Sequence, residues 1–262
     1  MSETVATTLA DRVAIVELNR PAAMNAVDMD MRRELYTALD GVARNPDIGA
    51  VVLTGNGKSF CAGADLKGVG KNPDQSARRT ARTLLHDFQP ILECITRLDK
   101  PVIAAISGGA IGVGMSLALA CDFLVMADNA YLLAPFVNIG LIPDGGAAWF
   151  LTRRIGYGRA LEILMEGQKL QAARCLDLGI ANRVVDSATI RDNAISWAAE
   201  LAGRAPLAMA LTKRMARLSL STGLSEALTM EAEFQSFLAN TEDAQEAIAA
   251  FGEKRKPQFR SR

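Results

Sequence analysis

The chain has 262 residues, of which 50% are hydrophobic and 22% are charged. This composition is typical of a globular protein with one large domain, or one domain with an appendage, and excludes the disordered and fibrous classes. Lys and Arg together number 29, as do Asp and Glu, so the net charge is zero and nothing favours nucleic acid or an anionic membrane as the partner.

The sequence predicts a cytoplasmic location. The N-terminal residues MSETVATTLADR lack the apolar run of a signal peptide and the Arg-rich pattern of a transit peptide. No uninterrupted apolar run reaches the ~18 residues of a membrane span. Four well-separated cysteines without a CxxC pair fit buried free thiols in a reducing compartment and disfavour a metal site: Cys61, Cys94, Cys121 and Cys175.

The N-terminal part of the chain begins with strand patterns. Two β-rich runs, residues 5–9 and 13–18, predict a hairpin. Asp28 is expected to cap a helix that extends to about residue 43, where apolar residues recur at helical spacing. The apolar run at 50–54 predicts a buried strand.

The middle of the chain alternates between helix and strand. A polar surface loop is expected at 68–76, followed by a helix at 77–98. Two buried strands at 101–106 and 123–127 flank a short, apolar, fully buried helix at 112–120. This order of elements predicts an α/β core.

Helix patterns dominate from residue 145 onward. A boundary is expected near residue 204, which divides the chain into an α/β part at 1–203 and a helical part at 204–262. The predicted helices are 145–155, 158–165, 172–178, 189–203, 206–218, 224–240 and 243–251.

Two features with possible chemistry do not match the common site patterns. His86 is the single histidine, and since no GxSxG elbow is present we interpret it as structural or surface-exposed. The glycine run at 108–114 fails the dinucleotide fingerprint at Leu117 and lacks the Lys-Ser/Thr of a P-loop. Either it packs closely at a strand-to-helix turn, or it brings backbone N–H groups near a ligand at the start of the helix.

A second glycine-containing turn, SFCAGADL at 59–66, can supply a partner for the glycine run. Its small residues allow backbone amides to face inward. Two N–H groups from separate segments that converge on one carbonyl oxygen form an oxyanion hole, and each donor can stabilise a transition state by ~3–4 kcal/mol.

These loops belong to a series of motifs that resembles the crotonase (enoyl-CoA hydratase/isomerase) superfamily. The motifs, in the order of that family, are NRP (19–21), MNA (24–26), SFCAGADL (59–66), KPVIAAI (100–106), GGAIGVG (108–114), CD (121–122), GLIP (140–143) and AFGEKRKPQF (250–259). The resemblance implies an α/β crotonase fold: a spiral of β-β-α units at 1–203 and a helical C-terminal trimerisation region at 204–262. It also implies a homotrimer or a dimer of trimers.

The resemblance implies an acyl-CoA thioester as substrate, with coenzyme A as part of the substrate and no separate cofactor or metal. The thioester carbonyl would lie between the backbone N–H groups of Ala64 and Val113, where valine replaces a more usual glycine. The residues that the resemblance places along the coenzyme A path are Met24, Ala62, Asp65 and Leu66, with Phe251 and Lys254 reaching the coenzyme A of a neighbouring subunit.

Hydratases of this family carry two glutamates around the reacting water, and their positions fall on Ser116 and Phe136 here. Because adding water to a double bond needs such acid/base groups, hydration is disfavoured. Asp144 matches an aspartate of dienoyl-CoA isomerases, of chlorobenzoyl-CoA dehalogenase and of the 1,2-epoxyphenylacetyl-CoA isomerase of phenylacetate degradation. The last resembles this chain around Phe136 and GLIPD, whereas the sequence offers no clear aromatic cage for dehalogenation.

Asp144 also has a purely structural interpretation. An aspartate before Gly145, Gly146 and a helical run is a good N-cap. Capping would lower the pKa of its carboxyl group, whereas apolar surroundings such as Phe136 would raise it. Asp65 and Asp122 are interpreted as structural, Asp65 through local hydrogen bonds of its turn and Asp122 at a helix-to-strand junction.

The sequence therefore favours an acyl-CoA isomerase that shifts a double bond, or isomerises a cyclic acyl-CoA, with Asp144 as its single acid/base. One alternative is an enoyl-CoA hydratase with non-standard water activation. The other is a non-catalytic acyl-CoA-binding protein that lacks the two glutamates.

Overall fold

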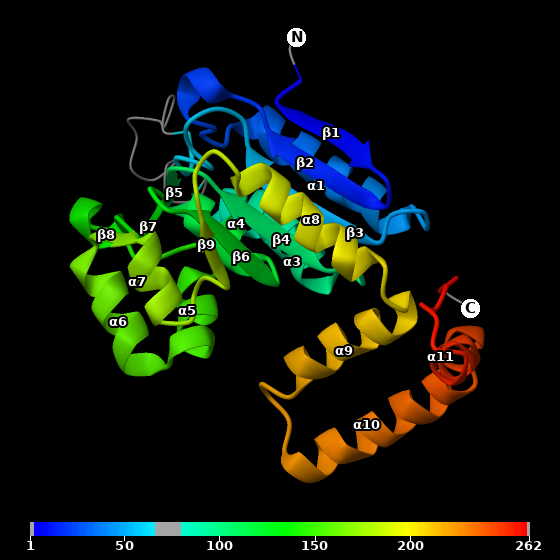
Figure 1. The fold of residues 1–262 in the computed structure, drawn as a ribbon. Helices are drawn as coiled ribbons and strands as arrows, with labels where there is room; N and C mark the ends of the chain where they lie inside the picture. Colours follow the sequence, from blue (N-terminus) through cyan, green and yellow to red (C-terminus); the bar gives the residue numbers. More distant parts are fainter. Residues whose placement is uncertain (1–2, 66–79, 261–262) are drawn as a thin grey trace.

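The computed structural model describes residues 3–65 and 80–260, so Leu66 and the expected surface loop at 68–76 lie outside the described residues. A six-stranded sheet forms the centre of this part of the chain (Figure 1). Its first two strands form the predicted antiparallel hairpin, and the others are parallel. In spatial order the strands are β1 (Val5–Ala10), β2 (Val13–Leu18), β3 (Ala50–Gly55), β4 (Val102–Ile106), β6 (Phe123–Ala127) and β9 (Arg183–Val185).

Helices cover both faces of this sheet. The predicted first helix is confirmed as α1 (Met29–Arg44), and the side chain of its N-cap, Asp28, accepts a hydrogen bond from the Met31 N–H at 2.9 Å. Figure 1 shows α8 (Ile190–Ala202) across the front of the sheet, while α1 and α3 (Gln89–Arg97) lie behind it. The parallel strands between them are buried, as their near-continuous apolar sequences predict.

The predicted helix at 77–98, whose first three residues lie outside the described residues, differs from expectation in its middle. The structure has a π-helical turn, η2 (Leu84–Phe88), immediately before α3. Pro90 explains the change, because it has no N–H to donate to the carbonyl of His86 and so interrupts the regular α-helical ladder. His86 is exposed in this turn, as its structural or surface interpretation predicts.

A three-stranded sheet that the sequence did not reveal lies beside the central sheet. It consists of β5 (Gly109–Ile111), β7 (Tyr131–Leu133) and β8 (Lys169–Gln171). Each strand has three residues, which is too short for an alternating pattern to register. The predicted buried helix follows β5 directly as α4 (Val113–Ala120), and every residue of it is buried.

Further helices surround the small sheet. They are η3 (Phe136–Ile139), α5 (Ala147–Ile155), α6 (Tyr157–Glu166) and α7 (Ala172–Asp177), while the short η1 (Pro21–Ala23) follows β2. None of the helices in the described part of the chain combines the length and the apolar character that crossing a membrane requires.

The C-terminal helices extend away from the sheets in Figure 1: α9 (Pro206–Leu218), α10 (Leu224–Ala239) and α11 (Glu242–Gly252). Asp122 attaches α9 to the core, because its carboxylate lies 2.6 Å from Lys213 Nζ and 3.2 Å from an Arg217 nitrogen. The same carboxylate accepts a hydrogen bond from the Val102 N–H at 2.9 Å, as expected for a structural aspartate. Large apolar side chains on α10 and α11, such as Leu224, remain exposed in the single chain.

The turn after β3 packs against β5 and α4. The Cys61 N–H donates to the carbonyl of Gly109 at 3.0 Å, and the Ile111 N–H donates to the carbonyl of Cys61 at 2.9 Å. Gly114 then passes so close that a β-carbon built there would lie 2.5 Å from the Cys61 carbonyl oxygen. Only a residue without a side chain allows this approach of the two segments.

We expect Gly114→Ala to lower the free energy of unfolding by about 1–3 kcal/mol, because its methyl group overlaps the Cys61 carbonyl. Gly158→Ala is the matched control, since a β-carbon at this α6 residue meets nothing within 4 Å. The control is expected to be neutral or to stabilise by up to about 1 kcal/mol. Urea unfolding at one protein concentration measures both variants, and equal unfolding midpoints would contradict the close packing.

Candidate active site

Two backbone N–H groups lie close together where the turn after β3 meets α4. A β-carbon built on Gly63 would lie 3.8 Å from the Val113 nitrogen, so the residue before Ala64 approaches the start of α4. Neither the Ala64 N–H nor the Val113 N–H donates a hydrogen bond within residues 3–65 and 80–260. Val113 is the first residue of α4, where N–H groups have no partner inside the helix and the helix dipole is positive.

Neighbouring backbone bonds fix this pair of segments from both sides. The Val27 N–H donates to the Gly63 carbonyl at 2.7 Å, and the Asp65 N–H donates to the Val27 carbonyl at 3.0 Å. The Gly112 N–H donates to the carbonyl of Leu133 in β7 at 2.9 Å. The two unpaired donors are therefore held by their neighbours and are free for a ligand oxygen.

Asp144 lies on the turn between η3 and α5, and its side chain does not cap the helix. The N-cap of α5 is Gly146, and no side chain caps it. Gly145 and Gly146 have φ values of 58° and 79°, so the helix begins only at Ala147. The N-cap interpretation of Asp144 is therefore wrong, because the two left-handed residues separate its carboxylate from the first helical turn.

The carboxylate of Asp144 is incompletely paired. Its Oδ1 atom is buried and has no hydrogen-bond partner in the described part of the chain. Burial raises the pKa of Asp144 above its usual value, because desolvation disfavours the charged form. Buried polar groups without a partner are rare in folded proteins, so this atom is a strong indication of function.

Ser116 holds the Asp144 turn from α4. This fully buried serine donates from Oγ to the backbone carbonyl of Asp144 at 2.9 Å. A β-carbon at Gly145 would lie 2.8 Å from the Ser116 β-carbon, so the turn rests directly on α4. Ser116, which the resemblance places at the first glutamate position of the hydratases, is thus a small residue that contacts backbone.

Phe136, which the resemblance places at the second glutamate position, forms an apolar wall. It is 6% exposed, and its ring lies 3.8 Å from the position of a β-carbon at Gly112, next to the start of α4. The structure therefore brings Asp144, Ser116, Phe136 and the Val113 N–H around the same end of α4. No second carboxylate accompanies Asp144 at the two glutamate positions.

The residues expected along the coenzyme A path are partly brought together. The Ala62 N–H donates to the carbonyl of Met24 at 2.9 Å, and the Met24 side chain is exposed. The Asp65 carboxylate pairs with Arg20 at 3.0 Å, an ion pair between two distant segments that fits its structural interpretation. Phe251 and Lys254 are exposed at the end of α11, and Figure 1 shows α11 on the other side of the molecule from β5.

A cavity of about 500 Å³ opens beside Gly145 and Gly146. We call it the acyl cavity, after the role that we propose for it below, and the aromatic residues that line it are Phe88, Trp149 and Phe150. Sequence reasoning missed it because these rings come from segments far apart in the chain, the end of η2 and the start of α5. Leu84, Phe88 and Leu92 also line the cavity. Their helical spacing in the sequence is the signal that could have indicated one wall of the cavity.

Comparison with known proteins agrees with this geometry. The sequence profile of the enoyl-CoA hydratase/isomerase family matches residues 8–262. A crystal structure of an enoyl-CoA hydratase from Polaromonas sp. JS666 superposes with a TM-score of 0.93 at 36% identity, over 98% of this chain and 99% of that one. The chain belongs to the enoyl-CoA hydratase/isomerase family and is an enzyme of the crotonase superfamily with the crotonase fold.

Individual relatives carry different activities. A probable enoyl-CoA hydratase of Rhodobacter capsulatus is 35% identical over 97% of this chain and 96% of its own length. A 1,2-epoxyphenylacetyl-CoA isomerase of Escherichia coli is 33% identical over 94% of both chains. Family membership therefore leaves the choice between hydration and isomerisation to the residues of the site.

Replacing the charged Asp144 is expected to stabilise the fold. The folded protein keeps the pKa of Asp144 above its unfolded value, so wild-type stability falls as the pH rises from the unfolded pKa through the folded pKa. At about pH 7 we expect Asp144→Asn to raise the free energy of unfolding by about 1 kcal/mol, the scale of one unsatisfied buried group. Near pH 3 the gain should vanish, because both states of the wild type are then protonated.

Urea unfolding at the two pH values measures this difference. Asp128→Asn is the control, because Asp128 is exposed and accepts a hydrogen bond only from the neighbouring Asn129 N–H among described residues. The control should change little at either pH. A less stable Asp144→Asn protein at neutral pH would show that the carboxylate is satisfied in the fold.

Proposed function

We propose that the protein is an acyl-CoA isomerase that moves a double bond, or rearranges a cyclic acyl-CoA, with Asp144 as its single acid/base. One observation carries the proposal: the buried Oδ1 of Asp144 has no partner in the described part of the chain. A structural carboxylate gains its stability from partners, whereas a catalytic base keeps a lone pair free for the substrate.

The N–H groups of Ala64 and Val113 are proposed to hold the thioester oxygen. Their lack of other described partners and the positive end of α4 support this role. As a proton leaves the substrate, negative charge develops on that oxygen, and preorganised donors stabilise it. Valine at 113 is compatible with the role, because the donor is a backbone group.

The proton transfer needs only one carboxylate. Asp144 takes a proton from C2 of a 3-enoyl-CoA, and the electron pair left behind spreads over the dienolate and the thioester oxygen. The protonated Asp144 then returns its proton to C4, which gives the 2-enoyl-CoA and restores the carboxylate. A pKa raised by desolvation makes the carboxylate a stronger base for the first step.

Hydration is the first alternative, since relatives of this chain are named hydratases. The two positions that would carry the acid/base groups for hydration hold the buried Ser116 and Phe136 in this chain. Neither side chain can deprotonate water. A non-catalytic binding protein is the second alternative. It would gain nothing from an unpaired buried carboxylate, which costs about 1–3 kcal/mol.

The acyl cavity supports an apolar or ring-containing acyl group, because aromatic side chains line it next to the Asp144 turn. For coenzyme A, we propose the path along Met24, Ala62 and Asp65, with Leu66 next in sequence. In a homotrimer or dimer of trimers, Phe251 and Lys254 of one subunit would complete the coenzyme A site of another. Their exposure in the single chain is compatible with this arrangement.

Asp144→Asn is expected to lower kcat for 3-enoyl-CoA isomerisation by about 10²–10⁴-fold, the range typical of a lost general acid/base. The assay follows double-bond migration and label uptake from deuterated water, with Asp128→Asn as the unaffected control. Accumulation of 3-hydroxyacyl-CoA by the wild type would instead indicate a hydratase. Tight binding of the ester without any label uptake would indicate a binding protein.

Ser116→Ala tests how the Asp144 turn is positioned. Removing the hydroxyl leaves the half-buried Asp144 carbonyl without one of its two described donors, the other being the Ala147 N–H. We expect kcat to fall about 10-fold with little change in KM, because a loss near 1.4 kcal/mol at the base affects the chemical step. Ser116→Thr, which keeps the hydroxyl, should retain more activity than Ser116→Ala. Equal kcat values for Ser116→Ala and the wild type would contradict the positioning role.

A further inference from the structure

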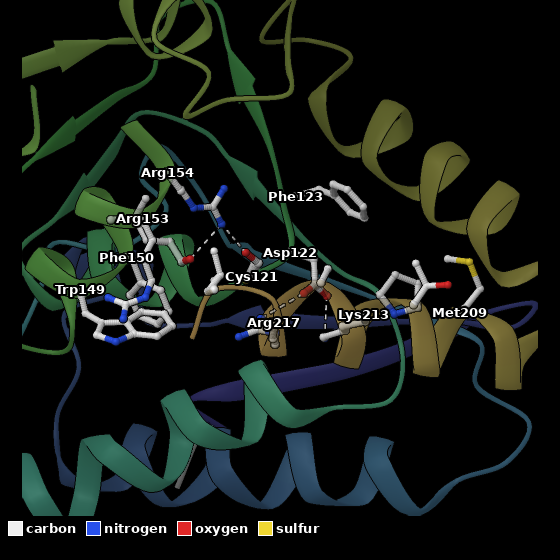
Figure 2. Close-up of a pocket in the computed structure, with 15 residues that line it drawn as sticks. Cys121, Asp122, Phe123, Trp149, Phe150, Arg153, Arg154, Met209, Lys213 and Arg217 are labelled. Carbon is white, nitrogen blue, oxygen red and sulfur yellow. Dashed lines mark hydrogen bonds and ion pairs between the residues drawn. The ribbon is translucent and has the colours of Figure 1, made fainter. Parts of the chain in front are cut away.

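A second cavity lies beside the acyl cavity, on the side of the C-terminal helices. It has a volume of about 370 Å³ and lies between α5, the start of β6 and α9 (Figure 2). We call it the distal pocket. Trp149, Phe150 and Arg217 line both cavities, so the two are neighbours: the acyl cavity reaches Gly145 and Gly146 beside Asp144, and the distal pocket reaches α9.

The distal pocket has an excess of positive charge. Its lining includes one carboxylate, Asp122, and four cationic side chains: Arg153, Arg154, Lys213 and Arg217. Asp122 already pairs with Lys213 and Arg217. It therefore cannot neutralise the remaining cations, and the pocket favours an anion.

The two arginines of α5 are not paired with carboxylates in the described residues. Arg154 donates to the backbone carbonyls of Leu119 at 3.0 Å and Cys121 at 2.6 Å. The Arg153 guanidinium lies 4.0 Å from the centre of the Trp149 ring, a stacking contact that leaves its N–H edges available. Figure 2 shows both arginines on the same side of the pocket as Trp149 and Phe150.

The rest of the lining is apolar, with residues such as Leu119, Phe123 and Met209. A ligand that suits both parts has an apolar stem and a negatively charged end. Planar guanidinium groups match a carboxylate in geometry as well as in charge.

We propose that the distal pocket receives the far end of the acyl group, and that this end carries a carboxylate. The inference rests on the proposed function for the position of the thioester, beside the unpaired N–H groups of Ala64 and Val113. The acyl chain then extends past Gly145, Phe150 and Trp149 to Arg153. The preferred substrates are thioesters of dicarboxylic acids, and Arg153 selects them.

Binding of unreactive esters tests the inference. Pairs of saturated acyl-CoA esters that differ only in a terminal methyl or carboxylate group are titrated into the full-length protein by calorimetry, over a series of chain lengths. At the best length we expect the carboxylate-ended ester to bind about 10-fold more tightly, the equivalent of one charge-assisted hydrogen bond. Arg153→Met should abolish this preference.

Arg159→Met is the matched control, because Arg159 is an exposed arginine of α6 that pairs with Glu162 and lies outside the lining of both cavities. It should keep the wild-type preference. Equal affinities of the two esters at every length, or an unchanged preference in Arg153→Met, would overturn the proposal. So would a change of oligomeric state in Arg153→Met without any preference in the wild type, which would indicate that a neighbouring copy fills the pocket.

The saturated esters have no double bond to move, so their binding is independent of isomerase activity. A terminal-carboxylate preference without label uptake from deuterated water would refute the proposed isomerisation and leave the pocket assignment intact. Label uptake without a terminal-carboxylate preference would refute the pocket assignment and leave the proposed isomerisation intact.

Discussion

The complete burial of α4 is the constraint on which the site depends. Its first N–H, at Val113, faces the turn after β3, which approaches only because Gly114 has no side chain. Ser116, one turn later, holds the carbonyl of Asp144. Just beyond its last residue, Asp122 anchors α9 through Lys213. A shift of this one helix would therefore change the proposed oxyanion donors, the proposed base and the C-terminal helices together.

The residues at the two positions where the resemblance places the hydratase glutamates limit the chemistry that we propose for this scaffold. Ser116 and Phe136 replace groups that would hold a water molecule with a backbone contact and an apolar ring. Burial of Asp144 raises its pKa, and one of its oxygens has no partner among the described residues. The desolvated carboxylate lowers the stability of the fold. Such a cost is expected of a site that keeps a base available for the substrate. In this account, Ser116 and Phe136 do not hold a water molecule, and the proposed reaction needs none.

Hydrophobic periodicity predicted the long elements because their patterns extend over several turns or residues. The helix from Met29, the buried strands β3, β4 and β6, and the buried helix α4 were all predicted from it. It could not predict β5 or β7, whose pairing is determined by contacts between distant segments. The start of α5 was predicted at residue 145, but the positive φ values of Gly145 and Gly146 delay it to Ala147. That shift removes the cap expected of Asp144, and the acyl cavity likewise depends on tertiary packing that no local pattern contains.

The central claim is that Asp144 is a desolvated carboxylate whose free oxygen serves as the base. A carbon-13 NMR titration of the Asp144 carboxyl group, assigned by comparison with Asp144→Asn, measures its pKa directly in the folded protein. The account predicts a value above the usual ~3.9 of an aspartate, because burial lacks a compensating partner. A pKa at or below that value would show that hydrogen bonds or a cation satisfy the carboxylate, and would contradict its role as the lone catalytic base.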